Sequence, residues 1–237
     1  MTASEQSPAQ PAPLVSVVVP AYQAEAYIGE ALESALAQDH GRVEVVVVDD
    51  GSTDRTAEIA SAYPVRLLHQ ANRGPAAARN AGVALARGEF VTILDADDVW
   101  PADRLSRQVA HLRAHPEHGI VLGLTEIFLT PEQPPPAHWP ATLTGRAIPA
   151  HPSTMLARTE VFEIVGGFDE ALRQCEDIDW LARVKDAGIR SGAIDHVVLH
   201  YRIHAANTSR DTIANRATLL RVLRDSVRRQ REAARVG

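Results

Sequence analysis

The chain has 237 residues and a formal net charge of -6, and hydrophobic residues make up 45% of it. Proteins that bind nucleic acid more often have a basic balance, so we expect no nucleic-acid partner. The single cysteine, Cys175, excludes a disulfide within the chain and a cysteine-rich metal site. The length fits one α/β domain, alone or with a small appendage.

Residues 1–13 are rich in Ala, Pro, Ser and Gln and contain no apolar stretch. They predict a disordered N-terminal tail and not a signal peptide. The longest apolar runs, such as residues 45–48, are far too short to cross a bilayer. We therefore expect a soluble, cytoplasmic protein.

Apolar strands alternate with helical segments along the first half of the chain. Strands are predicted at residues 14–19, 43–48, 65–69 and 90–94, and helices at residues 24–38, 53–62, 75–86 and 102–114. Such alternation predicts parallel βαβ units, with the apolar strands buried on both faces.

The second half of the chain is less regular. Its predicted elements are a strand at 120–129, a proline-rich loop at 131–140, a strand leading into a helix at 153–165, a helix at 176–187, a strand at 193–199 and a long arginine-rich amphipathic helix at 212–235.

Three polar segments, residues 20–22, 49–52 and 95–98, each follow a predicted strand. Parallel sheets bind their ligands at the carboxyl ends of the strands. Because these three segments would meet at one edge of the sheet, we expect them to form one site.

The sharpest of these segments is the acidic sequence Asp95-Ala96-Asp97-Asp98. Three carboxylates at one strand end repel each other unless a cation joins them, and Mg²⁺ typically shares one or two carboxylates with substrate phosphates. Taken alone, an Asp-x-Asp segment is more often a solvated turn that caps the next helix. Asp50 likewise fits either a capping turn or an acceptor for nucleobase and ribose hydrogen bonds.

The motifs together resemble the family 2 glycosyltransferases, which have the GT-A fold. The resemblance covers about residues 16–209 and is specific because of the order and spacing of its motifs. They are Ser16-Val-Val-Val-Pro-Ala-Tyr22, Val-Val-Val-Asp49-Asp50-Gly-Ser-Thr-Asp54, Asn72-Arg-Gly74, Ala78-Arg79-Asn80, Leu94-Asp-Ala-Asp-Asp98, Gly166-Gly-Phe-Asp-Glu170, Glu176-Asp-Ile-Asp179-Trp180-Leu-Ala-Arg183 and Tyr201-Arg-Ile-His204.

The resemblance implies an α/β fold, with a mostly parallel, Rossmann-like central sheet flanked by helices. It divides the chain into a GT-A domain at residues 14–209 and a C-terminal helical extension at residues 210–237. Within the domain, residues 14–115 would form the nucleotide-binding half and residues 116–209 the acceptor and catalytic half.

The resemblance further implies an inverting transfer from a nucleoside-diphosphate sugar, with a UDP-sugar as the first expectation. Pro20, Tyr22 and Asp50 would line the base pocket, with Tyr22 stacking or packing on the base. Arg79 would contact the nucleotide, and the alternative is a surface arginine on a helix.

The acidic segment would hold the rest of the donor. Asp95, with Ala96 beside it, would contact the ribose, and Asp97 would bind a divalent metal, Mn²⁺ or Mg²⁺, on the diphosphate. Asp98 would support the loop. His204 is a second candidate metal ligand and Arg202 a candidate diphosphate contact, and for both a packing role is the alternative.

A third acidic cluster begins the helix predicted at residues 176–187. Carboxylates in a first helical turn are favourable because of the helix dipole alone. Inverting transfer also needs a base that removes the acceptor proton. The family pattern assigns that role to the aspartate of the pair Glu176-Asp177, and Asp179 is the second candidate.

Partners implied by this reading are a nucleotide-sugar donor and a saccharide, lipid-linked or other small hydroxyl acceptor. The arginine-rich helix allows a peripheral contact with an anionic membrane, and packing on its own domain or a homodimer interface is the commoner explanation.

Two other functions stay open. One is a sugar-nucleotide pyrophosphorylase, which would need a Gly-rich basic loop where this chain has Pro20-Ala-Tyr-Gln-Ala-Glu25. The other is a non-catalytic sugar-nucleotide binder.

Overall fold

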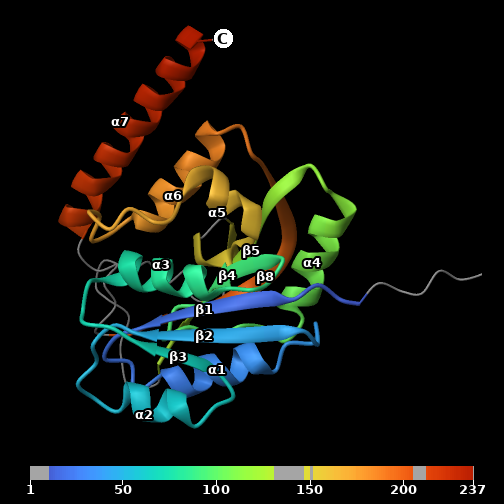
Figure 1. Cartoon of the computed structure of the whole chain (residues 1–237), viewed down its shortest axis with the longest axis vertical. Helices are drawn as coiled ribbons and strands as arrows, with labels where there is room; N and C mark the ends of the chain where they lie inside the picture. The colour runs from blue at the N-terminus through green and yellow to red at the C-terminus, as the bar shows by residue number, and fades with distance from the viewer. Residues whose placement is uncertain (1–10, 131–146, 150–151, 205–211, 237) are drawn as a thin grey trace, which may run out of the picture.

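The computed structural model describes residues 11–130, 147–149, 152–204 and 212–236 (Figure 1). Most of the predicted N-terminal tail and the proline-rich loop at residues 131–140 lie outside these described residues. The bounds of the described elements agree with the predicted ones to within a few residues.

One eight-stranded sheet forms the centre of the described structure, with the strand order β3-β2-β1-β4-β7-β5-β6 and β8 paired with β5. Its first half is the parallel set β1 (Val15–Ala21), β2 (Val43–Asp49), β3 (Arg66–His69) and β4 (Phe90–Ile93). β1, β2 and β4 are mostly buried, and β1 and β2 are rich in valine, as expected of a parallel sheet covered on both faces, whereas the edge strand β3 is only partly buried.

The second half of the sheet mixes both strand directions. It contains β5 (His118–Leu129), β6 (Ala147–Pro149), β7 (Leu156–Arg158) and β8 (Arg190–Ile203). β7 runs antiparallel between β4 and β5, while β5 and β8 are parallel. Four of the seven strand pairings are parallel, which confirms the predicted mostly parallel α/β fold.

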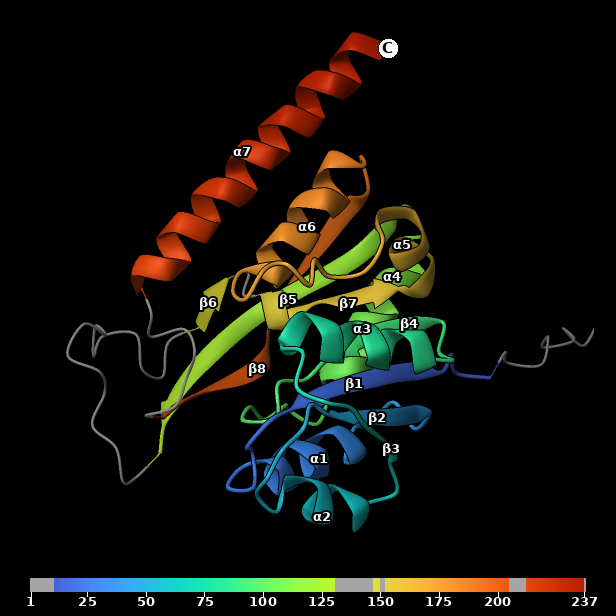
Figure 2. The same cartoon turned by 60° about the vertical axis from the view of Figure 1, so that its left-hand side comes forward.

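Helices cover both faces of the sheet (Figures 1 and 2). The α-helices are α1 (Ile28–Leu36), α2 (Thr56–Ser61), α3 (Pro75–Leu85), α4 (Arg104–Ala114), α5 (Thr159–Val165), α6 (Glu176–Asp186) and α7 (Thr212–Val236), and a 3-10 turn, η2, spans Pro152–Thr154. Val15, Val17 and Val19 of β1 pack in the core shared with α1 and α4, whereas Val18 packs in the core shared with α3, α5 and α6. Successive side chains of a strand point to opposite faces, so β1 supplies both cores.

The helix α7 lies outside these layers and packs along α6 (Figure 2). Its contact centres on Asp186 of α6, which accepts hydrogen bonds from Ser226, Arg229 and Gln230, each at 2.8 Å. Val222 is buried beside them. Among the described residues, no helix combines the length and the apolar character needed to cross a membrane.

Candidate active site

The predicted site residues lie at the carboxyl edge of the sheet, where the chain leaves β1, β2, β4 and β8. Backbone hydrogen bonds join the ends of β1, β2 and β4. The Asp50 N–H donates to the Ala21 carbonyl (2.8 Å), and the Leu94 N–H donates to the Val18 carbonyl (2.9 Å). Residues 20–22, 49–52 and 95–98 are therefore neighbours, as expected for one site.

Tyr22 follows β1 and leaves 55% of its surface exposed. An exposed aromatic face beside the edge of the sheet is available to pack on a planar ring. Pro20, half-buried at the end of β1, pairs with Val48 of β2 and fixes the backbone that presents Tyr22.

Asp50 holds the loop that leads into α3. Its Oδ1 accepts hydrogen bonds from the Gln70 side chain (2.6 Å) and the Arg73 backbone (3.0 Å), and its Oδ2 accepts one from the Gly74 backbone (2.8 Å). Gly74 has φ of 93°, a left-handed value that favours glycine. Asp50 thus shapes the loop before Arg79, and its predicted contact with the base would come in addition.

Arg79 is a buried bridge between the two halves of the domain. Its Nη2 lies 2.8 Å from Asp95 Oδ1, and its Nη1 donates to Glu176 Oε1. Burial opposes the charged guanidinium, yet the attraction of Asp95, Glu176 and Asp177 raises the pKa of Arg79 above its usual value. The predicted surface alternative for Arg79 is therefore wrong, because its side chain is only 9% exposed.

Asp95 is shared by two partners. While Oδ1 meets Arg79, Oδ2 accepts a hydrogen bond from the Ser153 hydroxyl at 2.9 Å. The side chain still has 24% of its surface exposed, so one side of the carboxylate faces the open site. Ala96, the next residue, is buried and places its neighbours Asp95 and Asp97 on the loop.

Asp97 meets His204, at the end of β8. His204 Nε2 lies 2.8 Å from Asp97 Oδ2, and the imidazole ring packs on Tyr27 with 4.6 Å between the ring centroids. His204 is buried, whereas Asp97 keeps 29% of its side chain exposed. The structure therefore brings the two predicted metal ligands together.

Asp98 is fully buried and accepts a hydrogen bond from the backbone N–H of Arg202 at 2.9 Å. Burial and the repulsion of Asp97 and Asp95 raise its pKa well above the usual aspartate value. These contacts agree with the predicted role of Asp98 in supporting the loop.

Arg202 is enclosed by protein groups. Its guanidinium donates to the Asp97 backbone carbonyl (2.7 Å) and to Glu30 (2.5 Å), and it lies 5.0 Å from the Tyr27 ring centroid and 4.7 Å from that of Phe128. This packing ties β8 to the Asp97 loop and to α1, which is the packing alternative that the sequence left open for Arg202.

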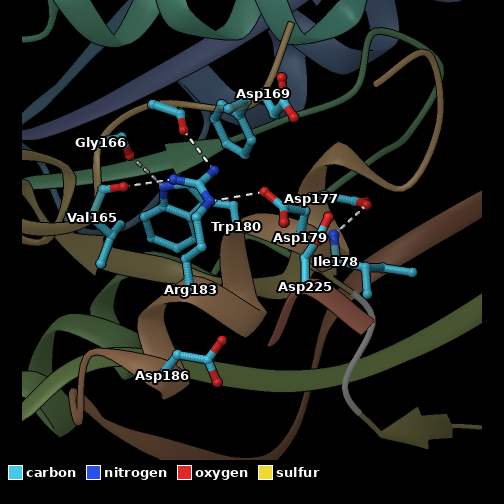
Figure 3. A network of polar contacts seen from close by, with 12 residues as sticks. Val165, Gly166, Asp169, Asp177, Ile178, Asp179, Trp180, Arg183, Asp186 and Asp225 are labelled. Carbon is cyan, nitrogen blue, oxygen red and sulfur yellow. Dashed lines mark hydrogen bonds and ion pairs between the residues drawn. The ribbon is translucent and has the colours of Figure 1, made fainter. Parts of the chain in front are cut away.

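The three acidic residues at the start of α6 have different surroundings, and Figure 3 shows those of Asp177 and Asp179. Glu176 is buried against Arg79, and Asp179 is bound at 2.8 Å by Arg183, which also donates to the carbonyls of Val165 and Gly167. Asp179 thus belongs to the network that holds the turn after α5. Its role as the second candidate base stays a prediction.

Asp177 differs from both neighbours. Its Oδ1 accepts a hydrogen bond from the Ile178 backbone at 2.7 Å, and Oδ2 has no hydrogen-bond partner within the described part of the chain. Burial raises the pKa of Asp177; Arg79 opposes this shift and Asp95 adds to it. The carboxylate is therefore held in place by one oxygen and free to accept a proton at the other.

Asp177 lines a small cleft between the two halves of the domain. The other lining residues are Arg79, Ile93, Pro152, Ser153, Met155 and Phe168. The lining combines apolar side chains with the polar residues Arg79, Ser153 and Asp177. The cleft has room for a group about the size of a water molecule, such as an acceptor hydroxyl, beside a base.

Sequence patterns missed several residues that build this site. Glu30, Tyr27 and Ser153 contact Arg202, His204 and Asp95, respectively, from distant segments. Local periodicity carries no signal for such pairings, because each of these residues fits an ordinary helix or turn.

Arg104 is the other missed residue, and it is completely buried. Its guanidinium donates to the Ser153 carbonyl (3.1 Å), the Thr92 hydroxyl (3.0 Å) and the Val198 carbonyl (3.1 Å). It lies 3.9 Å from the ring centroid of Trp100. Arg104 therefore positions the Ser153 segment that contacts Asp95.

Sequence comparison places this arrangement among known proteins. A family model described as Glycosyl transferase family 2 matches residues 16–171. Uncharacterized glycosyltransferase RP339 of Rickettsia prowazekii (strain Madrid E) is 30% identical over 213 residues, 83% of this chain and 66% of the relative. Succinoglycan biosynthesis protein ExoO of Rhizobium meliloti (strain 1021) is 50% identical over 101 residues, 41% of this chain and 29% of the relative.

Two solved structures share the fold over most of the chain. S. aureus TarS 1-349 in complex with UDP-GlcNAc superposes with a TM-score of 0.71 at 25% identity, covering 91% of this chain and 66% of that one. Mannosyltransferase PcManGT from Pyrobaculum calidifontis, in complex with GDP-Man and Mn²⁺, superposes with a TM-score of 0.69 at 26% identity, covering 91% and 64%. The chain therefore spans about two thirds or less of the length of these relatives.

Proposed function

The chain belongs to glycosyl transferase family 2, and from this premise we propose that it transfers a sugar, with inversion, from a nucleoside-diphosphate sugar to an acceptor hydroxyl. The observation that carries the proposal is the contrast at the start of α6, where Asp177 lines the cleft with one carboxylate oxygen that accepts no hydrogen bond from the described residues, while Glu176 and Asp179 are ion-paired with Arg79 and Arg183. An acceptor that loses a proton needs such an oxygen.

The donor would lie along the carboxyl edge of the sheet. Tyr22 packs on the base, Pro20 and Asp50 complete the base pocket, and Asp95 and Ala96 lie at the ribose. The exposure of Tyr22 and the open side of Asp95 support these positions.

Arg79 is proposed to act on the nucleotide mainly through Asp95 and Glu176. Its guanidinium is already bound by both carboxylates, so it fixes the carboxylate that faces the ribose. Arg202 is proposed to play the same positioning role for Asp97, whose backbone carbonyl it binds.

Asp97 and His204 fit a divalent metal. A partly exposed carboxylate and an imidazole nitrogen 2.8 Å apart form the start of a ligand set that the donor diphosphate would complete. Mn²⁺ suits this set, because it accepts carboxylate ligands, and Mg²⁺ is the alternative. A bound metal would supply positive charge to the leaving diphosphate.

The chemical step is a single displacement. Asp177 Oδ2 accepts the proton of the acceptor hydroxyl while the acceptor oxygen bonds to the anomeric carbon. The bond from that carbon to the diphosphate oxygen breaks, and its electron pair stays on the diphosphate. The charge that develops on the sugar is oxocarbenium-like.

UDP is the proposed donor nucleotide. TarS, the superposed structure with a TM-score of 0.71, is described in complex with UDP-GlcNAc, whereas PcManGT is described with GDP-Man. The acceptor is proposed to be a saccharide or a lipid-linked hydroxyl, as in polysaccharide assembly, and the similarity to a succinoglycan biosynthesis protein supports this class. A cytoplasmic site of action would follow from the nucleotide-sugar donor.

The outer face of α7 is proposed to bind an anionic membrane surface. Leu220, Leu223 and Val227 are 63%, 54% and 47% exposed on this face. The helix carries seven arginines against two acidic residues, in a chain whose net charge is -6. Basic helices with an exposed apolar stripe bind anionic lipid surfaces, whereas two arginine-rich α7 helices would repel each other, so charge favours a membrane over a symmetric pairing of this face with its own copy.

One experiment tests the proposed transfer. A panel of UDP-, GDP- and dTDP-sugars is incubated with the protein and Mn²⁺ or Mg²⁺, and release of nucleoside diphosphate is measured with and without saccharide acceptors. Nucleotide-dependent thermal stabilisation is measured in parallel. Stabilisation by UDP without turnover by any sugar would favour the non-catalytic binder, and consumption of nucleoside triphosphate with a sugar phosphate would favour the pyrophosphorylase.

A further inference from the structure

A cluster of metal-ligating side chains lies where α4 ends and β5 begins, away from the candidate active site. It contains His111 and His115 from α4 and its C-terminus, and Glu117 and His118 from the start of β5. The site at His204 follows the opposite end of β8, the strand that pairs with β5. β8 has 14 residues, so at roughly 3.3 Å per residue about 40 Å of strand separates the two locations.

We propose that His115, Glu117 and His118 form a binding site for a transition-metal dication such as Zn²⁺. One ligand atom from each of the three lies within 4.8 Å of the other two. Glu117 Oε1 is 3.3 Å from His115 Nδ1 and 3.8 Å from His118 Nε2. Ligands about 2.0 to 2.1 Å from a tetrahedral zinc lie roughly 3.3 Å from one another, so a small contraction closes this set around the ion.

His111 lies where it can orient the proposed metal ligand His118. Its Nε2 lies 3.1 Å from His118 Nδ1, and the two rings stack at an interplanar angle of 10°. With metal on Nε2, His118 would donate its Nδ1–H to His111, which fixes the tautomer and the direction of the ring.

The surrounding backbone keeps this arrangement in place. Gly192 of β8 leaves the space that the two rings fill, since a Cβ there would come within 2.1 Å of His111 Nε2 and 2.7 Å of His118 Nδ1. Arg158 donates to the carbonyls of Leu112 (2.6 Å) and His118 (3.0 Å), which joins the helix end to the strand start.

The location also suits a cation and leaves room for one. The carbonyl end of α4 carries the negative end of the helix dipole. His115, Glu117 and His118 keep 46%, 43% and 20% of their side chains exposed, so an ion can enter from solvent. Three protein ligands would leave a fourth tetrahedral position for water or another small ligand. Metal binding would join α4 to β5 and stabilise that junction.

The test is Zn²⁺ titration by calorimetry on the tag-free full chain, with Co²⁺ absorption as a second readout of nitrogen ligation. Asp97→Asn removes a proposed ligand of the active-site metal, so it separates the two sites. We expect Asp97→Asn to retain one Zn²⁺ per chain, and adding His115→Ala or His118→Ala to Asp97→Asn should abolish that binding. Glu117→Gln and His111→Phe should weaken binding at least tenfold.

His196→Ala is the matched control, because His196 also pairs with a carboxylate, that of Asp103 at 3.1 Å, and belongs to none of the three-ligand groups among the described residues. It should bind Zn²⁺ like the wild type. Zn²⁺ should also raise the melting temperature of Asp97→Asn but not of the double variant Asp97→Asn, His118→Ala. Equal stoichiometry and affinity in the wild type, His115→Ala and His118→Ala would overturn the proposal.

Discussion

His204 Nε2 lies 2.8 Å from Asp97 Oδ2, although the two residues are 107 positions apart in the chain. The contact depends on three elements, because Arg202 fastens β8 to the Asp97 carbonyl and Tyr27 of α1 covers the imidazole. A ligand pair held in this way is preorganised, so metal binding would require little rearrangement.

The first prediction concerns this pair. His204→Gln should raise the Mn²⁺ concentration needed for half-maximal transfer by about 10- to 100-fold, and Asp97→Asn should raise it further, because it removes the charged ligand. The measurement is the initial rate at saturating donor over a series of Mn²⁺ concentrations. His69→Gln is the control, since His69 pairs with Asp49 at 3.1 Å at the same edge of the sheet. An equal shift in the control would remove His204 from the metal site.

The second prediction concerns the base. Asp177→Asn should reduce kcat by about 10²- to 10⁴-fold, the range for losing a general base, while UDP still stabilises the protein. Asparagine can still accept the Ile178 hydrogen bond at its carbonyl oxygen, so the start of α6 should stay intact.

The control for this prediction is Asp179→Asn. It removes the negative charge from the 2.8 Å ion pair with Arg183 and should lower the melting temperature while kcat stays within a few-fold of the wild type. If Asp179→Asn loses turnover and Asp177→Asn keeps it, the roles of the two aspartates are reversed.

The third prediction is a pH dependence. Burial raises the pKa of Asp177, with Arg79 opposing and Asp95 adding to the shift. A general base works when deprotonated, so kcat should fall as the pH drops through this raised pKa, above the ordinary aspartate value of 3.8. Asp95→Asn removes a repelling charge and should move the acid limb of the kcat profile to lower pH. An unmoved limb would show that another group titrates.

The raised pKa of Asp177 also makes the free energy of unfolding depend on pH. A folded-state pKa above the unfolded value means that the folded protein binds the proton more tightly. The contribution of Asp177 to stability is therefore fully present below pH 3.8 and is lost as the pH rises through the raised pKa. Asp177→Asn should remove this loss, which is measurable as a smaller decline of unfolding free energy over that pH range.

The fourth prediction concerns the buried bridge through Arg79. Arg79→Met should destabilise the fold by about 3 to 5 kcal/mol, because it leaves the carboxylates of Asp95 and Glu176 without their cation. The side chains of Arg79 and Glu176 are 9% and 7% exposed, so water replaces little of the lost interaction. The measurement is denaturant unfolding followed by circular dichroism.

The double variant Arg79→Met, Glu176→Gln is the matched comparison. It removes one of the stranded charges and should recover part of the lost stability. A double variant that is less stable than Arg79→Met would show that Glu176 contributes through contacts other than Arg79.

The parallel half of the fold could be predicted because its signals are local. In β1 the continuous apolar run of Val17, Val18 and Val19 marks a strand that is buried on both faces. The acidic segment of Asp95 directly follows such a strand, so its place at the sheet edge followed from the strand prediction.

The rest depends on contacts between distant segments. β7 lies antiparallel between β4 and β5, and a strand of only three residues, Leu156–Arg158, carries no sign of its direction in the sequence. From the sequence alone, Arg202 could either contact a diphosphate or form an ion pair with Glu30. The ion pair depends on the fold, which brings α1 beside β8. The burial of Arg104 could not be predicted from its neighbours in the sequence either, because an arginine in a first helical turn is ordinarily exposed.

The last prediction concerns α7. The protein should sediment with vesicles that contain anionic lipid and not with neutral vesicles, and binding should weaken as salt rises, because screening reduces the attraction of the arginines. Leu220→Glu and Leu223→Glu place a charge on the exposed apolar face and should abolish sedimentation. Ala233→Glu is the control: it adds the same charge at an exposed position three helical turns from Val222, on the side of α7 that faces α6. Vesicle binding that survives both leucine substitutions would reject this face of α7 as the membrane contact, and a concentration-dependent dimer that the same substitutions dissociate would assign the face to a second copy of the chain.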